Sequence, residues 1–347
     1  MPIATSLTRL LEIRHPVLLA PMDVIAGNRL VTAVSSAGGF GILGGGYGER
    51  AWLEQETAKL AGLSAPFGIG FITWSLAKRP ELLDIALAAR PSAIMLSFGD
   101  PAPFAPRIKS AGADLICQVQ DEAMARQALD AGADILIAQG TEAGGHGASR
   151  TTIDLLPAIV DLAAGRVPVV AAGGIADGRG LAAMMMLGAS GVLLGTRFYA
   201  SQEADGAEEA KRRICAASSG STVRGIIFDL SRNNVWPSPF TGRCLVNDHA
   251  RRWIGREVEL MQNVAAVAAE YAAAKAAGNF DVAAVIAGEA VGLIHDIPSA
   301  AEIVERIAIE AEQLLEGRRN SAGGVLPSPL AGEGGAQRRM RGSIRGE

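Results

Sequence analysis

The chain has 347 residues, of which 49% are hydrophobic and 20% are charged, and its net charge is −4. This composition excludes a disordered chain, which would be polar and highly charged, and the charge balance lacks the clustered basic excess of a nucleic-acid-binding protein. Three cysteines without Cys-x-x-Cys spacing predict no disulfide framework and no zinc site, and they fit a reducing compartment.

From Pro16 to about Ser218, short apolar runs rich in Val and Ile alternate with segments of helical spacing, several of which end in glycine. Strands that are apolar on both faces and alternate with helices indicate a parallel sheet. Eight such units in roughly 200 residues predict a (β/α)8 TIM barrel over residues 1–218; an open doubly wound sheet is the alternative. The expected strands begin near Val17, Phe40, Phe67, Ala93, Asp114, Asp134, Pro168 and Gly191.

The region after the barrel differs in pattern. Residues 219–320 start with a stretch rich in prolines and aromatic residues, and two or three helices are expected to follow, including a long one over 249–278 and another over 280–293. We expect these residues to form a helical cap, or lid, on the barrel mouth. Residues 321–347 have no hydrophobic period and are expected to be a disordered tail. We interpret this tail as an accidental extension, with a nucleic-acid-binding arm as the alternative.

No membrane segment is expected. The most promising uncharged stretch lies between Arg179 and Arg197, is interrupted by glycines, and divides into a helix-like half and a strand-like half, so we interpret it as buried core. The amino-terminal residues lack the continuous apolar core of a secretory signal peptide. A cytoplasmic protein is therefore expected.

Two sets of glycines have different meanings. Gly39, Gly41 and Gly44 have the spacing of a dinucleotide-binding motif, but here the motif leaves a helix and runs along a strand, which indicates close backbone approach instead. The second set ends the seventh and eighth strands, where TIM barrels typically bind phosphate through backbone N–H groups. Tight turns are the alternative, and the absence of an acidic metal-binding cluster nearby argues against a metal. This second set is Gly173, Gly174 and Gly195, with Thr196 as an added hydroxyl donor.

His146 is the strongest candidate for proton transfer. It follows the sixth strand in the glycine-rich sequence GTEAGGHG, on the face where TIM barrels carry their active sites, and we expect it on a flexible loop. An imidazole can take or give a proton near neutral pH. We expect His15, His249 and His295 to be structural, because they show no metal-ligand spacing, although His249 falls in the expected cap.

Four motifs together resemble one known family. APM at 20–22, AQGTEAGGHG at 138–147, PVVAAGGIADGRG at 168–180 and GVLLGTRF at 191–198 are similar to the nitronate monooxygenases, formerly called 2-nitropropane dioxygenases, which are FMN-dependent (β/α)8 barrels. The resemblance covers roughly residues 14–316. The glycine-rich blocks are shared with a sister group, the flavin-dependent enoyl-acyl carrier protein reductases.

The resemblance implies a role for individual residues. His146 matches the catalytic histidine, and the glycines after the last two strands match the grip on the FMN phosphate. Many members carry Asn or Gln at the end of strand three, where this chain has GIGFITW, so Gln118 is expected to contact the flavin instead. The implied cofactor-binding residues are Ala20, Pro21, Met22, Gln118, Gln139, Gly144, Gly145, Gly173, Gly174, Gly195 and Thr196, with no metal ligand.

The implied reaction is oxidation of an alkyl nitronate by O2 to a carbonyl compound and nitrite, with FMN supplying the redox chemistry. His146 would stabilise the nitronate charge when protonated, or take the α-proton of a nitroalkane when neutral. Two alternatives remain open: an NAD(P)H-dependent enoyl reductase with an acyl carrier protein as partner, and an FMN-binding barrel without enzymatic activity. The expected partners are a small nitronate and O2, with a homodimer left open and with neither nucleic acid nor membrane.

Overall fold

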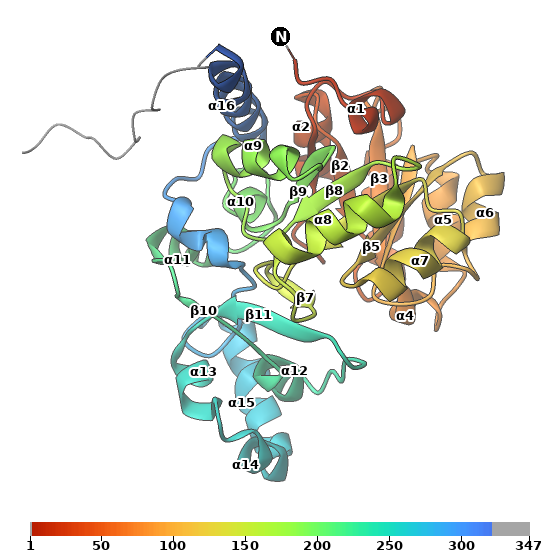
Figure 1. The fold of residues 1–347 in the computed structure, drawn as a ribbon. Helices are drawn as coiled ribbons and strands as arrows, with labels where there is room; N and C mark the ends of the chain where they lie inside the picture. The colour runs from red at the N-terminus through yellow and green to blue at the C-terminus, as the bar shows by residue number, and fades with distance from the viewer. Residues whose placement is uncertain (1, 321–347) are drawn as a thin grey trace, which may run out of the picture.

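The computed structural model describes residues 2–320, and the expected disordered tail, 321–347, lies outside these described residues. Figure 1 shows two parts: a barrel surrounded by helices, and a smaller part that adjoins it near strand β7. We call the smaller part, residues 222–285, the cap.

The predicted TIM barrel is confirmed. Eight parallel strands follow the order β1-β9-β8-β6-β5-β4-β3-β2, and a parallel bridge between Leu18 and Phe40 joins the first and last of them. All eight expected strands are present. They are β1 (Val17–Leu19), β2 (Gly41–Gly44), β3 (Phe67–Ile72), β4 (Ala93–Ser97), β5 (Asp114–Val119), β6 (Ile135–Gln139), β8 (Val169–Ala172) and β9 (Gly191–Leu194).

Helices connect the strands and form the outer wall (Figure 1). Helix α1 precedes the first strand, and the others follow the strands in turn. They are α1 (Ser6–Leu10), α2 (Asn28–Ser36), α3 (Arg50–Lys59), α4 (Thr73–Leu76), α5 (Leu82–Ala88), α6 (Ala105–Ser110), α7 (Glu122–Asp130), α8 (Thr152–Ala163), α9 (Gly178–Met186), α10 (Thr196–Tyr199) and α11 (Glu208–Ala216).

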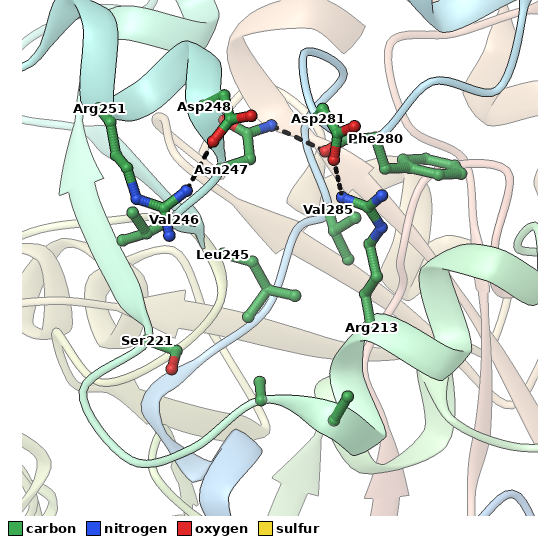
Figure 2. Close-up of a pocket in the computed structure, with 12 residues that line it drawn as sticks. Arg213, Ser221, Leu245, Val246, Asn247, Asp248, Arg251, Phe280, Asp281 and Val285 are labelled. Carbon is green, nitrogen blue, oxygen red and sulfur yellow. Dashed lines mark hydrogen bonds and ion pairs between the residues drawn. The ribbon is translucent and has the colours of Figure 1, made fainter.

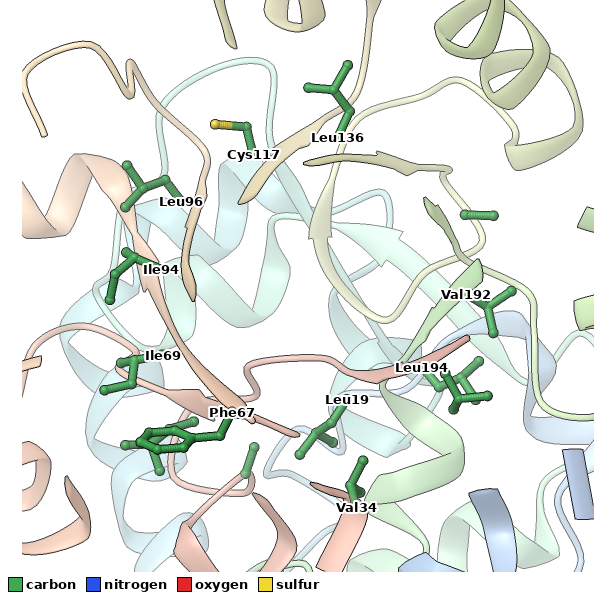
Figure 3. Close-up of a cluster of buried hydrophobic side chains, with 14 of the residues drawn as sticks. Leu19, Val34, Phe67, Ile69, Ile94, Leu96, Cys117, Leu136, Val192 and Leu194 are labelled. Carbon is green, nitrogen blue, oxygen red and sulfur yellow. The ribbon is translucent and has the colours of Figure 1, made fainter. Parts of the chain in front are cut away.

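Alternation along the strands divides the core into two layers. Leu18 belongs to the inner cluster together with side chains such as Ile42 and Ile116. Its neighbours in the chain belong to the outer cluster, between strands and helices, and Figure 3 shows Leu19 and Leu136 in that layer. Leu7 and Leu11, in and just after α1, belong to the inner cluster, so α1 closes one end of the barrel.

Close backbone approach, expected for the first glycine set, is visible at β2. A Cβ atom on Gly41 would lie 2.4 Å from the carbonyl oxygen of Val31, and one on Gly44 would lie 2.3 Å from that of Met22. No side chain fits at either position, because such contacts are far inside van der Waals distance. These glycines therefore allow α2 and the chain at the end of β1 to pack directly against β2.

The cap contains strands that the sequence did not predict. β10 (Thr222–Gly225) pairs with β11 (Thr241–Leu245), which pairs in turn with β7 (Gly145–Gly147) from the loop after β6. A three-stranded antiparallel sheet thus joins the cap to the barrel. The cap helices are α12 (Ile227–Ser231), α13 (Asp248–Trp253), α14 (Glu257–Gln262) and α15 (Val264–Ala276).

Two helix expectations in this region were wrong. The long helix over 249–278 is divided into α13, α14 and α15, because Gly255 adopts a φ of +76° that ends the first of them. The expected helix over 280–293 is largely extended: the backbone N–H of Leu245 donates to the carbonyl of Val285 at 2.9 Å, and only the short 3-10 helix η1 (Glu289–Leu293) follows.

The last helix does not lie on the cap. α16 (Ala300–Asn320) contacts α9 and α2 on the outside of the barrel, and Figure 1 shows it beside α9, far from the cap helices. The interval 219–320 therefore contains a cap beyond the carboxyl end of the barrel and a helix of the barrel wall.

Helix α1 offers a matched test of barrel closure. Leu7 is fully buried, whereas Leu10 on the same helix is 41% exposed. We expect Leu7→Ala to lower the free energy of unfolding by about 2–5 kcal/mol, and Leu10→Ala to change it by about 0.5 kcal/mol or less. Urea denaturation measures both, and equal losses in the two variants would contradict the role assigned to α1.

Candidate active site at the barrel mouth

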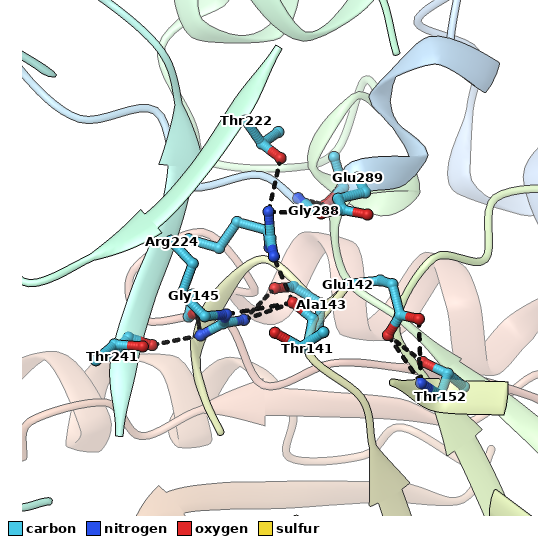
Figure 4. Close-up of polar contacts among 12 residues, drawn as sticks. Thr141, Glu142, Ala143, Gly145, Thr152, Thr222, Arg224, Thr241, Gly288 and Glu289 are labelled. Atoms are coloured by element: carbon cyan, nitrogen blue, oxygen red, sulfur yellow. Dashed lines mark hydrogen bonds and ion pairs between the residues drawn. The ribbon is translucent and has the colours of Figure 1, made fainter. Parts of the chain in front are cut away.

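Two buried arginines hold the glycine-rich loop after β6. The guanidinium of Arg224 donates to the carbonyls of Thr141 (2.8 Å) and Ala143 (2.9 Å), and Arg243 Nε donates to the carbonyl of Thr141 (2.8 Å). Figure 4 shows these contacts converging on the loop. Burial and the neighbouring Arg243 lower the pKa of Arg224 to about 10, so the Arg224 guanidinium remains cationic at neutral pH. The expected flexible loop therefore forms the paired strand β7.

The same loop packs tightly against the chain that leaves the cap. A Cβ atom on Gly144 would lie 2.6 Å from the nitrogen of Gly288, so the two backbones can approach only because both residues are glycine. Gly288 N donates to Thr196 Oγ1 at 2.9 Å, and Glu289 N donates to the carbonyl of Glu142 at 2.9 Å. The hydroxyl of Thr196 still has its own hydrogen to donate.

His146 lies on β7 and is buried between two cap residues. Its Nε2 is 2.9 Å from Oδ2 and 3.1 Å from Oδ1 of Asp229, and its ring stacks on Trp236 with 3.4 Å between ring centroids and 6° between planes. On the barrel side, Gln139 Nε2 donates to the carbonyl of His146 at 3.0 Å. A histidine from the barrel is thus oriented by residues from both parts of the molecule.

The protonation of His146 follows from these contacts. Burial lowers the pKa of His146 below its ordinary value, with a smaller contribution from Arg232 and Arg224, while Asp229 opposes the shift. The carboxylate of Asp229 also accepts from Arg232 at 2.6 Å. Because a carboxylate accepts, Nε2 carries the hydrogen, and in the neutral ring Nδ1 keeps the lone pair. Within residues 2–320, Nδ1 forms no hydrogen bond, which leaves it available to a substrate.

Asp229, Trp236 and Arg232 were missed by the sequence analysis. Asp229 stands in FDLSR, which has no distinguishing spacing, and Trp236 attracted notice only as part of an aromatic, proline-rich stretch. The pairing of β7 with β11 brings them to His146 across more than 80 residues of chain. His249, in contrast, is buried in the cap and forms a hydrogen bond of 2.8 Å with Ser231.

The expected cofactor residues form a neighbouring group at the ends of β1, β8 and β9. Ala20 and Met22 face Gly195, since a Cβ atom there would lie 3.6 Å from Ala20 Cβ and 3.7 Å from Met22 Sδ. Pro21 packs on Gly70 of β3, and Gly173 and Gly174 lie against the loop after β6. Gln118 lies apart from this group, on the wall of a cavity at the ends of β4 and β5.

The last two strands present backbone donors without protein acceptors. Among the hydrogen bonds of residues 2–320, the N–H groups of Gly173, Gly174, Gly195 and Thr196 do not appear as donors. All four residues are partly or fully exposed. Backbone N–H groups without protein acceptors suit an anion such as a phosphate, and a Cβ atom at Gly195 would meet only ordinary van der Waals contacts.

A second cavity, of about 280 Å³, lies between α11 and the cap (Figure 2). Its charged side chains are already paired, because Arg213 contacts Asp281 and Arg251 contacts Asp248, each at 2.8 Å. Nothing in this cavity adjoins His146.

The described part of the chain offers little support for a metal site or for a reactive thiol. Residues 2–320 contain no group of three or more His, Cys, Asp or Glu arranged to hold a metal ion. Burial raises the pKa of Cys117 and of Cys244 to about 12, so neither provides a thiolate at neutral pH. Among the described helices, none has both the length and the apolarity to cross a membrane.

Comparisons with known proteins agree with this geometry. The family model described as nitronate monooxygenase matches residues 4–81 and 72–310. A nitronate monooxygenase of Metarhizium robertsii, npaC, is 36% identical, with 86% of this chain and 91% of that protein covered. A protein of Mycobacterium tuberculosis named (3aS,4S,5R,7aS)-5-hydroxy-7a-methyl-1-oxo-octahydro-1H-indene-4-carboxyl-CoA dehydrogenase is 30% identical, with 90% and 97% covered.

Two solved structures share the fold. FabK from Thermotoga maritima aligns with a TM-score of 0.81 and 31% identity, over 92% of this chain and 99% of that one. Nitroalkane oxidase from Streptomyces ansochromogenes aligns with a TM-score of 0.75 and 26% identity, over 90% and 100%.

The His146–Asp229 contact has a measurable electrostatic consequence. Asp229 raises the pKa of His146 against the effect of burial, so Asp229→Asn removes that support and leaves Arg232 uncompensated. We expect the pKa of His146 to fall further below 6.5, as measured by NMR titration of the histidine ring, with His146→Asn to assign the signal. Asp248→Asn, at an exposed cap residue, should leave the titration unchanged. A rise in the pKa in Asp229→Asn would contradict this assignment.

Proposed function

Because the chain belongs to the nitronate monooxygenase family, we propose that it is an FMN-dependent enzyme that oxidises alkyl nitronates with O2 to a carbonyl compound and nitrite. The observation that carries the proposal is the geometry of His146. A buried imidazole, held by Asp229 through Nε2 and open at Nδ1, lies beside the loops where a TIM barrel carries its active site.

The residues present fit FMN. Free backbone N–H groups after β8 and β9 suit its phosphate, and the ends of β1 and β9 lie side by side at Gly195, which has no side chain. In this proposal Gly173, Gly174, Gly195 and Thr196 hold the phosphate, while Ala20, Pro21, Met22, Gln139, Gly144 and Gly145 contact the rest of the cofactor. Gln118, which lies apart from this group, is not among these contacts. Bound FMN would supply the electron transfer between the nitronate and O2.

His146 has two possible tasks, and its surroundings favour one. Its lowered pKa makes the ring neutral at pH 7, so Nδ1 can take the α-proton of a neutral nitroalkane. Asp229 fixes the tautomer and stabilises the imidazolium that forms, while Arg232 donates to the Asp229 carboxylate and holds it in place. A preformed nitronate needs no such step. The likeness to a nitroalkane oxidase structure is consistent with use of nitroalkanes as well.

A second candidate function is a dehydrogenase acting on a coenzyme A thioester. The Mycobacterium tuberculosis relative favours this candidate, because the alignment covers 97% of that protein. The two candidates differ in a simple observable: the monooxygenase consumes O2 and releases nitrite from a nitronate without a nicotinamide, whereas the dehydrogenase does neither.

The phosphate site is tested by adding a single methyl group. The nearest atoms to a Cβ on Gly195 lie at 3.6 Å, so Gly195→Ala fits the protein itself but projects into the space assigned to FMN. We expect the apoprotein to keep its melting temperature and the Kd for FMN to rise at least tenfold in a fluorescence titration. Gly225→Ala, where a Cβ meets nothing within 4 Å, is the control. Equal FMN affinity in both variants would count against the assignment.

The role of His146 is tested by comparing two substrates. His146→Asn should still bind FMN, because the phosphate contacts are distant from the ring. We expect turnover of neutral nitroethane to fall by about 10²–10⁴-fold, the usual contribution of a general base, and turnover of ethyl nitronate to fall less. Oxygen consumption and nitrite release measure both. If the two rates fall equally, His146 acts by stabilising charge or by positioning the substrate, and not as a general base. If the wild type requires NADH or NADPH, the monooxygenase proposal fails.

A further inference from the structure

A cavity of about 340 Å³ lies at the ends of β4 and β5, between α7 and the cap loop that follows Trp236. Its volume is within the range of small-molecule sites. Most of its wall is apolar or aromatic. The apolar and aromatic lining residues are Trp74, Leu96, Phe98, Pro101, Cys117, Val119, Met124, Ala128, Pro237, Pro239 and Phe240.

This cavity is one aromatic side chain away from His146. Trp236 stacks on His146, and its edges contact Trp74 and Phe98, with ring centroids at 5.3 and 5.1 Å. Both of those residues line the cavity. A second connection is polar: Gln120, also in the lining, donates to Gln139 at 2.8 Å, and Gln139 donates to the carbonyl of His146. The Trp236 ring and Gln139 therefore stand between the cavity and the proposed catalytic histidine.

Two polar atoms in the cavity wall lack partners. Oε1 of Gln120 and Nε1 of Trp74 are buried, and neither forms a hydrogen bond within residues 2–320. Gln120 is only 1% exposed. Leaving a buried acceptor and a buried donor unpaired is unfavourable. The lining also offers neutral hydrogen-bonding side chains to a ligand, namely Gln118, Gln127 and Ser238.

The charge of the lining restricts the ligand further. Among the lining residues, all of which belong to the described chain, Asp100 is charged and no Lys, Arg or His is present. A carboxylate or phosphate in this cavity would lose its hydration without gaining a cationic partner. The geometry thus selects an uncharged group.

We propose that this cavity binds the substituent of the substrate, an uncharged apolar chain of medium length that ends in a neutral hydrogen-bonding group such as an amide or hydroxyl. The inference rests on the proposed nitronate chemistry and specifies its substrate class: the enzyme prefers extended, uncharged nitronates over short or carboxylated ones. The reacting carbon lies near His146, and the chain passes Trp236 into the cavity.

Filling the cavity tests this proposal. Ala128, on the cavity wall, is 1% exposed, and Ala128→Phe occupies the space of the chain. We expect the ratio of kcat/KM for the anion of 1-nitrohexane to that for ethyl nitronate to fall at least tenfold. Because Ala128→Phe can disturb packing, Gln127→Phe on the rim of the cavity is a second variant, and Arg126→Phe, at an exposed residue outside the lining, is its control.

A binding measurement separates this inference from the proposed function. Calorimetric titration of the FMN-loaded protein should show saturable binding of hexanamide, at least tenfold weaker binding of hexanoate, and loss of hexanamide binding in Ala128→Phe and Gln127→Phe. Absence of hexanamide binding to wild type overturns the cavity assignment. An unchanged substrate ratio in both filling variants overturns the substrate role. If hexanamide binds as expected but wild type oxidises neither nitronate, the proposed function itself fails and the substrate role fails with it.

Discussion

The pairing of β7 with β11 is the contact on which the arrangement of the candidate site depends. Gly242 lies opposite His146 in this pairing, so one antiparallel ladder joins the loop after β6 to the cap. The pairing persists because the buried guanidiniums of Arg224 and Arg243 satisfy the carbonyls of the glycine-rich loop, which would otherwise be unpaired. Without the ladder, His146 would lack both Asp229 and Trp236.

The barrel and the cap therefore contribute different groups to the candidate site. The barrel provides bare backbone N–H groups at the ends of β8 and β9, where no cap residue is needed. The cap provides the groups that tune and cover the imidazole, namely Asp229, Arg232 and Trp236. Under the proposed function, a change in the cap would therefore alter proton transfer and substrate choice while the residues assigned to the cofactor stay the same. Relatives with different named reactions on one fold are consistent with this division.

Aromatic packing connects the imidazole to the neighbouring cavity. Trp236 stacks on His146 and makes T-shaped contacts with Trp74 and Phe98, which line the cavity. Offset and edge-to-face contacts of this kind fix aromatic positions more firmly than apolar burial alone. The same ring thus links the protonation site to the shape of the substrate.

The sequence by itself determined the barrel, because the signals for its elements are local. Each strand is a short apolar run, and each helix shows helical spacing of apolar residues, in several cases followed by a glycine that ends it. It also marked the glycines after β8 and β9 and the position of His146. Only the tertiary structure decided what His146 contacts: Asp229 and Trp236 lie more than 80 residues away, and nothing local to either predicts a partner. The cap strands were missed for the same reason, since β11 is stabilised by pairing with β7 and not by its own pattern. Local physics decides secondary structure and barrel closure, whereas the proton-transfer site is formed by long-range pairing.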